Sequence, residues 1–282
     1  MPLPLTELLQ VLDQLAPLRL AEDWDNVGLL IDPRESGREL PISRLLLTID
    51  ATPTVVSEAE SLRAQCLLSY HPPLFRAKKR FSRAEDPVVF AAAHAGFAVY
   101  SPHTALDAAP SGLTDWLAEG AGSGRLTALV PALTNEGGST AISPPGHEPS
   151  PAIGAGRLLE LDQPTPLGTI LERLKQHLGL TQVRLAASAA HDHGASIRRI
   201  AFCAGSGGSL FERATADLFV TGELGHHAVL AKLAQGQSVI LCEHSNTERG
   251  YLPRYRQRLL DATRGEIEVL IAAADREPLQ IV

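Results

Sequence analysis

The stretch SVILCEHSNTE, residues 238–248, joins a short apolar run to an abruptly polar end. An uninterrupted apolar run of this length is typical of a strand buried on both faces, and this strand would end at His244. The stretch CLLSYHPPLF, residues 66–75, repeats the pattern and places His71 at a strand end. Because strands buried on both faces belong to sheets covered by helices, the two stretches predict an α/β fold.

The rest of the chain alternates between short apolar runs and helical patterns. We expect strands at residues 45–50, 66–71, 98–103, 156–161, 183–188, 197–205, 217–222, 238–244 and 268–274. We expect a short amphipathic helix near the N-terminus and further helices at 53–64, 85–95, 111–119, 167–178, 209–215, 225–235 and 246–261. This alternation predicts sheets flanked by helices.

The length and composition are those of a globular protein with two lobes. A chain of 282 residues can bury two cores, and 44% hydrophobic with 20% charged residues is ordinary for such proteins. The segment around 121–155 is rich in Pro, Gly, Ser and Thr and lacks apolar periodicity. We therefore expect an N-terminal lobe at 1–122, a linker at 123–154 and a C-terminal lobe at 155–282.

Charge and cysteine content limit the partners and the compartment. The net charge of -7 makes nucleic acid an unexpected partner, and the basic cluster RAKKRFSR at 76–83 is interpreted as a solvated loop rather than a phosphate-binding one. Three cysteines without CxxC spacing indicate buried thiols in a reducing compartment. With neither a signal peptide pattern nor an apolar run near the ~20 residues of a membrane span, the expected location is the cytoplasm.

Several strand ends carry side chains that bind metals. Ligands in open α/β sheets gather at the carboxyl ends of strands, where the sequence places His71, His103 and His244. His71, Asp107, His244 and Glu248 together would supply two imidazoles and two carboxylates. This mixed set suits divalent ions such as Zn, Mn or Fe.

Each of these residues also has a purely structural interpretation. Ser245-Asn246-Thr247-Glu248 matches a capping box, in which Glu248 would return a hydrogen bond to the backbone of Ser245. Asp107 could stabilise the turn that leads into the next helix. His71 could be an ordinary strand-terminal residue held extended by Pro72.

Two further strand-to-helix junctions could contact a ligand. Gly205, Gly207 and Gly208 could bring backbone N–H groups to a phosphate, although a tight structural turn without a ligand is the favoured explanation. His227 lies next to His226, and adjacent helical residues point about 100° apart. We expect His227 either to support the site or to be exposed on the surface.

The quoted motifs, with EDWDNVGLLI (22–31), SPHTALDAAPSGLTDWLA (101–118) and ADLFVTGELGHH (216–227), resemble the NIF-three-like family. Family members carry names such as type-2-like GTP cyclohydrolase and NGG-interacting-factor-three-like protein, and the variants here are most similar to the branch with the eukaryotic members. The resemblance implies two related α/β lobes, a dinuclear metal site in the cleft between them and a ring-shaped hexamer. His71 and Asp107 would bind one metal, His244 the second, and Glu248 would bridge both.

One departure from the family bears on the second metal. Many members have two consecutive histidines where this chain has Tyr70-His71, and tyrosine is a poorer ligand at neutral pH because its pKa is near 10. Two functions follow from the resemblance: a metal-dependent hydrolase of a nucleotide-like substrate, with His103 or His227 moving protons, or a non-catalytic, metal-stabilised scaffold that binds partners such as transcription factors.

Overall fold

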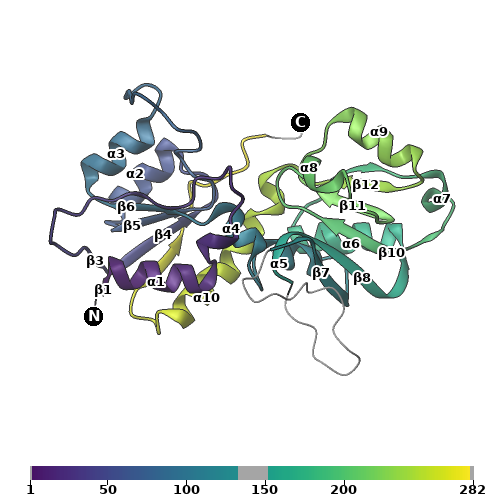
Figure 1. Cartoon of the computed structure of the whole chain (residues 1–282), viewed down its shortest axis with the longest axis horizontal. Helices are drawn as coiled ribbons and strands as arrows, with labels where there is room; N and C mark the ends of the chain where they lie inside the picture. Colours follow the sequence, from purple (N-terminus) through teal and green to yellow (C-terminus); the bar gives the residue numbers. More distant parts are fainter. Residues whose placement is uncertain (1, 133–151, 280–282) are drawn as a thin grey trace. The chain divides into compact units, whose positions relative to one another are not determined.

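The computed structural model describes residues 2–132 and 152–279, which form two compact units (Figure 1). The first unit contains residues 1–106 and 251–282, and the second contains residues 107–250. Each unit has its own sheet with helices packed on it, as Figure 1 shows. The predicted α/β class is therefore confirmed.

The sheet of the first unit has five strands in the order β13-β4-β5-β6-β2. Four of them run parallel and β2 pairs antiparallel to β6. The strands are β2 (Gly28–Ile31), β4 (Arg44–Thr48), β5 (Cys66–Ser69), β6 (Ala98–Ser101) and β13 (Glu268–Ile271). A separate pair joins β1 (Leu3–Pro4) to β3 (Pro41–Ile42).

Helices cover both faces of this first sheet (Figure 1). Alternate strand residues such as Leu46, Leu67 and Val99 pack against helices α2 and α3, because successive side chains of a strand point to opposite faces. Helices α1 and α10 lie on the other face. The bounds are α1 (Leu5–Leu15), α2 (Pro53–Ser61), α3 (Pro87–Ala95) and α10 (Leu252–Ala262), with 3-10 turns at Leu18–Leu20 and Arg249–Tyr251.

The sheet of the second unit has six strands in the order β7-β8-β10-β11-β12-β9. The adjacent strands β10, β11 and β12 are parallel to one another, and the other pairs in the sheet are antiparallel. The strands are β7 (Gly124–Pro131), β8 (Gly154–Pro166), β9 (Arg184–Ala186), β10 (Ser196–Phe202), β11 (Leu218–Thr221) and β12 (Ser238–Leu241). The helices are α5 (Leu113–Glu119), α6 (Leu167–Leu178), α7 (Ala189–Asp192), α8 (Gly208–Phe211) and α9 (His226–Ala234), while α4 (His103–Ala108) carries residues of both units.

The chain departs from the predicted organisation at two places. Residues 124–131 of the predicted linker form strand β7, which pairs with β8; residues 133–151 lie outside the described part. The C-terminal segment returns to the first sheet, because β13 pairs with β4 through Val269 and Leu45. Both differences come from strand pairing between distant segments, which local periodicity cannot reveal.

The structure also bears on the expectations about the cysteines and about membrane-spanning segments. Cys66, Cys203 and Cys242 are buried free thiols, as predicted. Burial raises the pKa of the Cys66 thiol to about 12, and burial with the nearby Glu243 carboxylate does the same for Cys242. No helix among the described residues is long and apolar enough to span a bilayer.

A fully buried arginine ties β8 to the start of α5. Arg157 has 0% of its surface exposed, and its guanidinium contacts the Asp115 carboxylate. It also donates hydrogen bonds of 2.5 to 3.3 Å to four carbonyl oxygens of the second unit, those of Gly154, Gly156, Ala108 and Ala109. Removing one partner of a buried charged network leaves the other groups without compensation.

We therefore expect Arg157→Met to lower the free energy of unfolding by about 3 to 5 kcal/mol, measured by urea denaturation followed by circular dichroism. Arg125→Met is the matched control, because Arg125 is 65% exposed and its contact to Glu160 is 3.6 Å long. The control should change stability by less than about 1 kcal/mol. Equal effects of the two substitutions would contradict a structural role for the buried network.

Candidate functional site

His71 follows the end of β5 and is oriented by a carboxylate from the end of β4. Its backbone N–H donates to Ile49 O at 3.0 Å, which continues the pairing of the two parallel strands. Its ring Nδ1 lies 2.9 Å from Asp50 Oδ1. Because an ionised carboxylate only accepts hydrogen bonds, Nδ1 carries the proton and Nε2 keeps a lone pair. This is the tautomer that a metal or a proton donor can use.

His244 follows β12 in the second unit and is held in the same way. Its Nδ1 donates to Glu223 Oε1 at 2.6 Å, so Nε2 again keeps the lone pair. That nitrogen lies 3.4 Å from Glu248 Oε1. The Glu248 side chain is 1% exposed, whereas the Glu223 side chain is 56% exposed. A buried carboxylate beside an imidazole nitrogen is a donor pair suited to a divalent cation.

The local backbone explains how Glu248 comes to face His244. The chain forms a 3-10 turn at Ser245–Thr247 with His244 as the N-cap residue, and a capping hydrogen bond from the His244 side chain is absent. Thr247 Oγ1 donates to His244 O at 2.7 Å and accepts from Gly205 N–H at 2.8 Å. The helix expected at 246–261 therefore begins later, at Leu252, and its N-cap residue is Tyr251. Ser245 is not the N-cap of this helix, as the capping-box interpretation requires.

Gly205 leaves the space that the His244–Glu248 pair occupies. A Cβ atom at this position would lie 2.8 Å from both Glu248 Oε1 and His244 Nε2, and the residue has φ of +57°. Space and backbone conformation both require glycine here. Gly207 lies against Phe211, and α8 beyond it has only four residues. A phosphate contact by Gly205, Gly207 and Gly208 stays a prediction.

His103 is held by a buried carboxylate in the first unit. Its Nδ1 lies 2.8 and 2.9 Å from the two oxygens of Asp25, whose side chain is 0% exposed. Thr104 adds hydrogen bonds to Asp25 from its backbone N–H at 3.1 Å and its hydroxyl at 2.5 Å. Burial alone would raise the pKa of Asp25, but the hydrogen bonds from His103 and Thr104 outweigh it and hold this pKa below 3.8.

Tyr70 and His71 pack with His103 into a cluster of rings. Tyr70 is 3% exposed, and its ring centroid lies 4.9 Å from that of His71 and 5.3 Å from that of His103. The His71 and His103 rings are 5.3 Å apart. His103 has φ of +28°, a conformation uncommon for a non-glycine residue. The surroundings of both imidazoles are thus dense and constrained.

The other predicted site residues lie on short helices. Asp107 is half-buried on α4, one turn after His103. His227 lies in the first turn of α9, is exposed, and has its ring 5.5 Å from that of His226. The placement of His227 fits the surface alternative, and its part in a reaction stays a prediction.

The imidazoles of His71 and His244 and the carboxylate of Glu248 are groups that could hold a metal ion. His71 belongs to the first unit and the other two to the second. The imidazoles of His71, His103 and His244 are each oriented by a carboxylate that was not predicted: Asp50, Asp25 and Glu223 respectively. Asp50 and Glu223 follow strands, so the rule that selected the histidines could have found them. Asp25 comes from a loop distant in sequence and carried no such signal.

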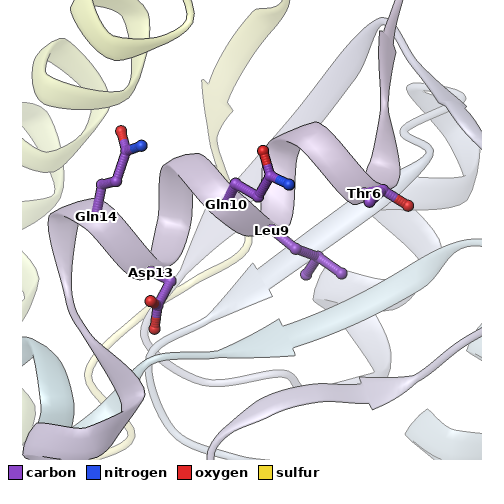
Figure 2. A pocket seen from close by; sticks show the side chains of 5 residues that line it. All are labelled: Thr6, Leu9, Gln10, Asp13 and Gln14. Carbon is purple, nitrogen blue, oxygen red and sulfur yellow. The ribbon is translucent and has the colours of Figure 1, made fainter.

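A shallow hollow also lies along α1 (Figure 2). Its lining comes from a single helix: Thr6, Leu9, Gln10, Asp13 and Gln14. Figure 2 shows these side chains spread along the outer face of the helix rather than converging on one point. The hollow has one carboxylate and lacks an imidazole, so it offers no second candidate for a metal or a reaction.

Comparisons with known sequences give consistent matches along nearly the whole chain. Residues 3–278 match the family model Duf34/NIF3 (NGG1p interacting factor 3). A relative from Schizosaccharomyces pombe, "Protein NIF3 homolog", is 40% identical over 97% of this chain and 96% of its own length. "NIF3-like protein 1" from Rattus norvegicus is 34% identical over 99% of this chain and 93% of its own length.

Solved structures show the same fold at low sequence identity. A Bacillus cereus protein related to NIF3 has a TM-score of 0.80 with 18% identity and covers 100% of both chains. Reduced HcgD from Methanocaldococcus jannaschii has a TM-score of 0.77 with 21% identity over 97% of this chain and 99% of its own. At these identities the comparison establishes the two-lobe fold.

We expect Gly205→Ala to weaken the binding of Zn²⁺ by about tenfold or more, because the new methyl group takes the space of the His244–Glu248 pair. Isothermal titration calorimetry measures the affinity. Gly179→Ala is the matched control: Gly179 also has positive φ, +68°, but a Cβ atom there meets nothing within 4 Å. Similar losses in the two variants would show that backbone strain, not the crowded pair, is responsible.

Proposed function

The chain belongs to the Duf34/NIF3 family, and from that premise we propose that it is a divalent-metal-dependent hydrolase of a nucleotide-like substrate, similar to type-2-like GTP cyclohydrolases. The observation that carries the proposal is the pair of histidines whose Nδ1 atoms are fixed by carboxylates, which prepares both Nε2 atoms as ligands. We place the protein in the cytoplasm, as a ring-shaped hexamer.

The proposed ligands are His71, Asp107, His244 and Glu248, holding one or two ions such as Zn, Mn or Fe. Two findings support a fit between residues and metal. The donors are imidazole nitrogens and carboxylate oxygens, the set these ions prefer. Gly205 keeps the space beside His244 and Glu248 open, because any side chain at this position would fill it. A bound ion would lower the pKa of water and neutralise charge that develops on the substrate.

His103 is the proposed proton carrier. Its Nδ1 proton is committed to Asp25, so Nε2 can accept a proton from the attacking water and return it to the leaving group. Asp25 remains ionised at neutral pH because its pKa is lowered, and it stabilises the imidazolium form of His103. Because the Asp25 side chain is 0% exposed, it would not contact the substrate itself. Asp25 is thus a positioning residue for His103.

The second candidate function is a non-catalytic scaffold in which the metal stabilises a hexamer that binds protein partners. Two observations favour it. The Saccharomyces cerevisiae relative, 34% identical over 98% of this chain and 96% of its own length, is named "NGG1-interacting factor 3". Tyr70 is buried at 3% exposure, and it stands at the position where the resemblance implies a second histidine ligand, which favours one metal over two.

Measurement of bound metal and turnover in the same preparations separates the two functions. We expect Glu248→Ala to lose most bound metal by plasma mass spectrometry and to lose nucleotide hydrolysis with it. Glu266→Ala, an exposed carboxylate, should retain both. We expect Tyr70→His to raise the metal content per chain. Full metal loading without turnover on any of a panel of nucleotides would reject the hydrolase and leave the scaffold.

Asp25→Asn tests the role of His103. We expect kcat to fall by about 100-fold with KM changed less than about threefold, because the neutral amide no longer fixes the tautomer or stabilises the imidazolium. Asp23→Asn is the matched control, since Asp23 is exposed two residues away. Bound metal should be unchanged in both. An unaltered kcat in Asp25→Asn would remove His103 from the reaction.

A further inference from the structure

Two exposed aromatic rings lie beside His103 in the first unit. Trp24 is 60% exposed and Phe75 is 47% exposed, and their ring centroids are 5.8 Å apart with planes tilted by 51°. The centroid of His103 lies 6.1 Å from that of Trp24 and 6.0 Å from that of Phe75. The imidazole plane is steeply inclined to both, at 79° and 71°. The three rings thus form one corner with two open aromatic surfaces.

Hydrogen bonds fix the residues that neighbour the two exposed rings. Asn26 Nδ2 donates to Leu74 O at 2.5 Å, which ties the loop of Trp24 to the loop of Phe75. Asp25, the neighbour of Trp24, is fixed by His103 and Thr104. Rigid aromatic side chains lose little conformational entropy when they bind, so a fixed exposed pair favours binding.

The size of the exposed surface fits a small ring better than a protein partner. Trp and Phe side chains bury about 150 to 250 Å² each when fully covered, so the exposed parts of Trp24 and Phe75 amount to about 250 Å². A stable protein interface needs about 800 Å² from each partner. Because the two ring planes are tilted by 51°, a flat heteroaromatic ring can stack on one of them and meet the other at an angle, and it needs no more surface than this pair offers.

The segment that follows Phe75 supplies positive charge. Residues 76–83 read RAKKRFSR, in a chain whose net charge is -7; the sequence alone favours a solvated loop here, and the exposed rings beside its start are what bring the phosphate-binding alternative back. Lys78 pairs with Asp86. Arg76, Lys79 and Arg80 are exposed, and they make no ion pair within the part of the chain that the structure describes. Guanidinium and ammonium groups in the segment that directly follows a stacking ring are suited to a ligand that joins an aromatic ring to phosphate.

We propose that Trp24 and Phe75 form a stacking site for the base of a mononucleotide, with its phosphate facing the cations of residues 76–80. The proposal rests on the proposed function and deepens it, because it names the residues that select a nucleotide as the ligand. The stacking site lies against His103, the proposed proton carrier, so a base bound there would lie next to the imidazole that transfers the proton.

Equilibrium dialysis of the full-length protein with AMP and GMP, in EDTA without added metal, tests the site. We expect Trp24→Leu and Phe75→Leu each to weaken binding about tenfold, because stacking on an aromatic side chain is lost. Trp24→Phe keeps a ring and should stay within about threefold of wild type. Phe81→Leu is the matched control: Phe81 is 49% exposed in the same segment, outside the three-ring corner.

Further ligands show which part of the nucleotide the site recognises. Ribose 5-phosphate, which has the phosphate but no base, should bind at least about tenfold more weakly than AMP. Equal binding of the two compounds would overturn the proposal, as would Trp24→Leu binding AMP like wild type. A (dT)12 oligonucleotide that binds more tightly than AMP would indicate a nucleic-acid surface instead. A changed sedimentation coefficient in Trp24→Leu would indicate a contact between copies of the chain.

These outcomes are independent of the metal. Binding of AMP in EDTA with loss in Trp24→Leu supports the stacking site even if metal-loaded protein shows no turnover. Loss of metal in Glu248→Ala with unchanged AMP binding in Trp24→Leu supports the metal proposal and rejects the stacking site.

Discussion

The arrangement of the candidate site depends on one repeated interaction, a hydrogen bond from the Nδ1 atom of a histidine to a carboxylate. His71, His103 and His244 each make it, with Asp50, Asp25 and Glu223 as acceptors. The bond orients the ring and selects the tautomer with a lone pair on Nε2. Without it neither the tautomer nor the direction of Nε2 would be set by a hydrogen bond.

The α/β fold makes this interaction possible because its parallel strands end together. β4 and β5 run side by side, so Asp50 and His71 follow neighbouring strand ends. β11 and β12 do the same for Glu223 and His244 in the second unit. Buried apolar strands thus fix the backbone from which the polar side chains project. The same rule of parallel sheets places functional groups at carboxyl ends in many unrelated α/β proteins.

Local sequence patterns predicted most of the fold but only part of the site. The apolar runs at 45–50 and 66–71 and the helix at 167–178 are found where expected, since burial and periodicity are local signals. The return of β13 to β4 was missed because pairing partners far apart leave no local trace. Asp25 was missed for the same reason, as it meets His103 across 78 residues. Ser245 and Glu248 matched a capping box, yet tight 3-10 turns changed the geometry.

The most direct test of this account is the tautomer of each histidine in the metal-free protein, read from two-bond ¹H–¹⁵N couplings of ¹⁵N-labelled protein at pH 7.5. The account predicts that His71, His103 and His244 are protonated at Nδ1, with unprotonated Nε2. Exposed His226, which makes no carboxylate hydrogen bond among the described residues, should show the Nε2-protonated form that dominates in free imidazoles. Nε2 protonation at His71 and His244 would contradict the account, because it would leave neither nitrogen prepared for a metal.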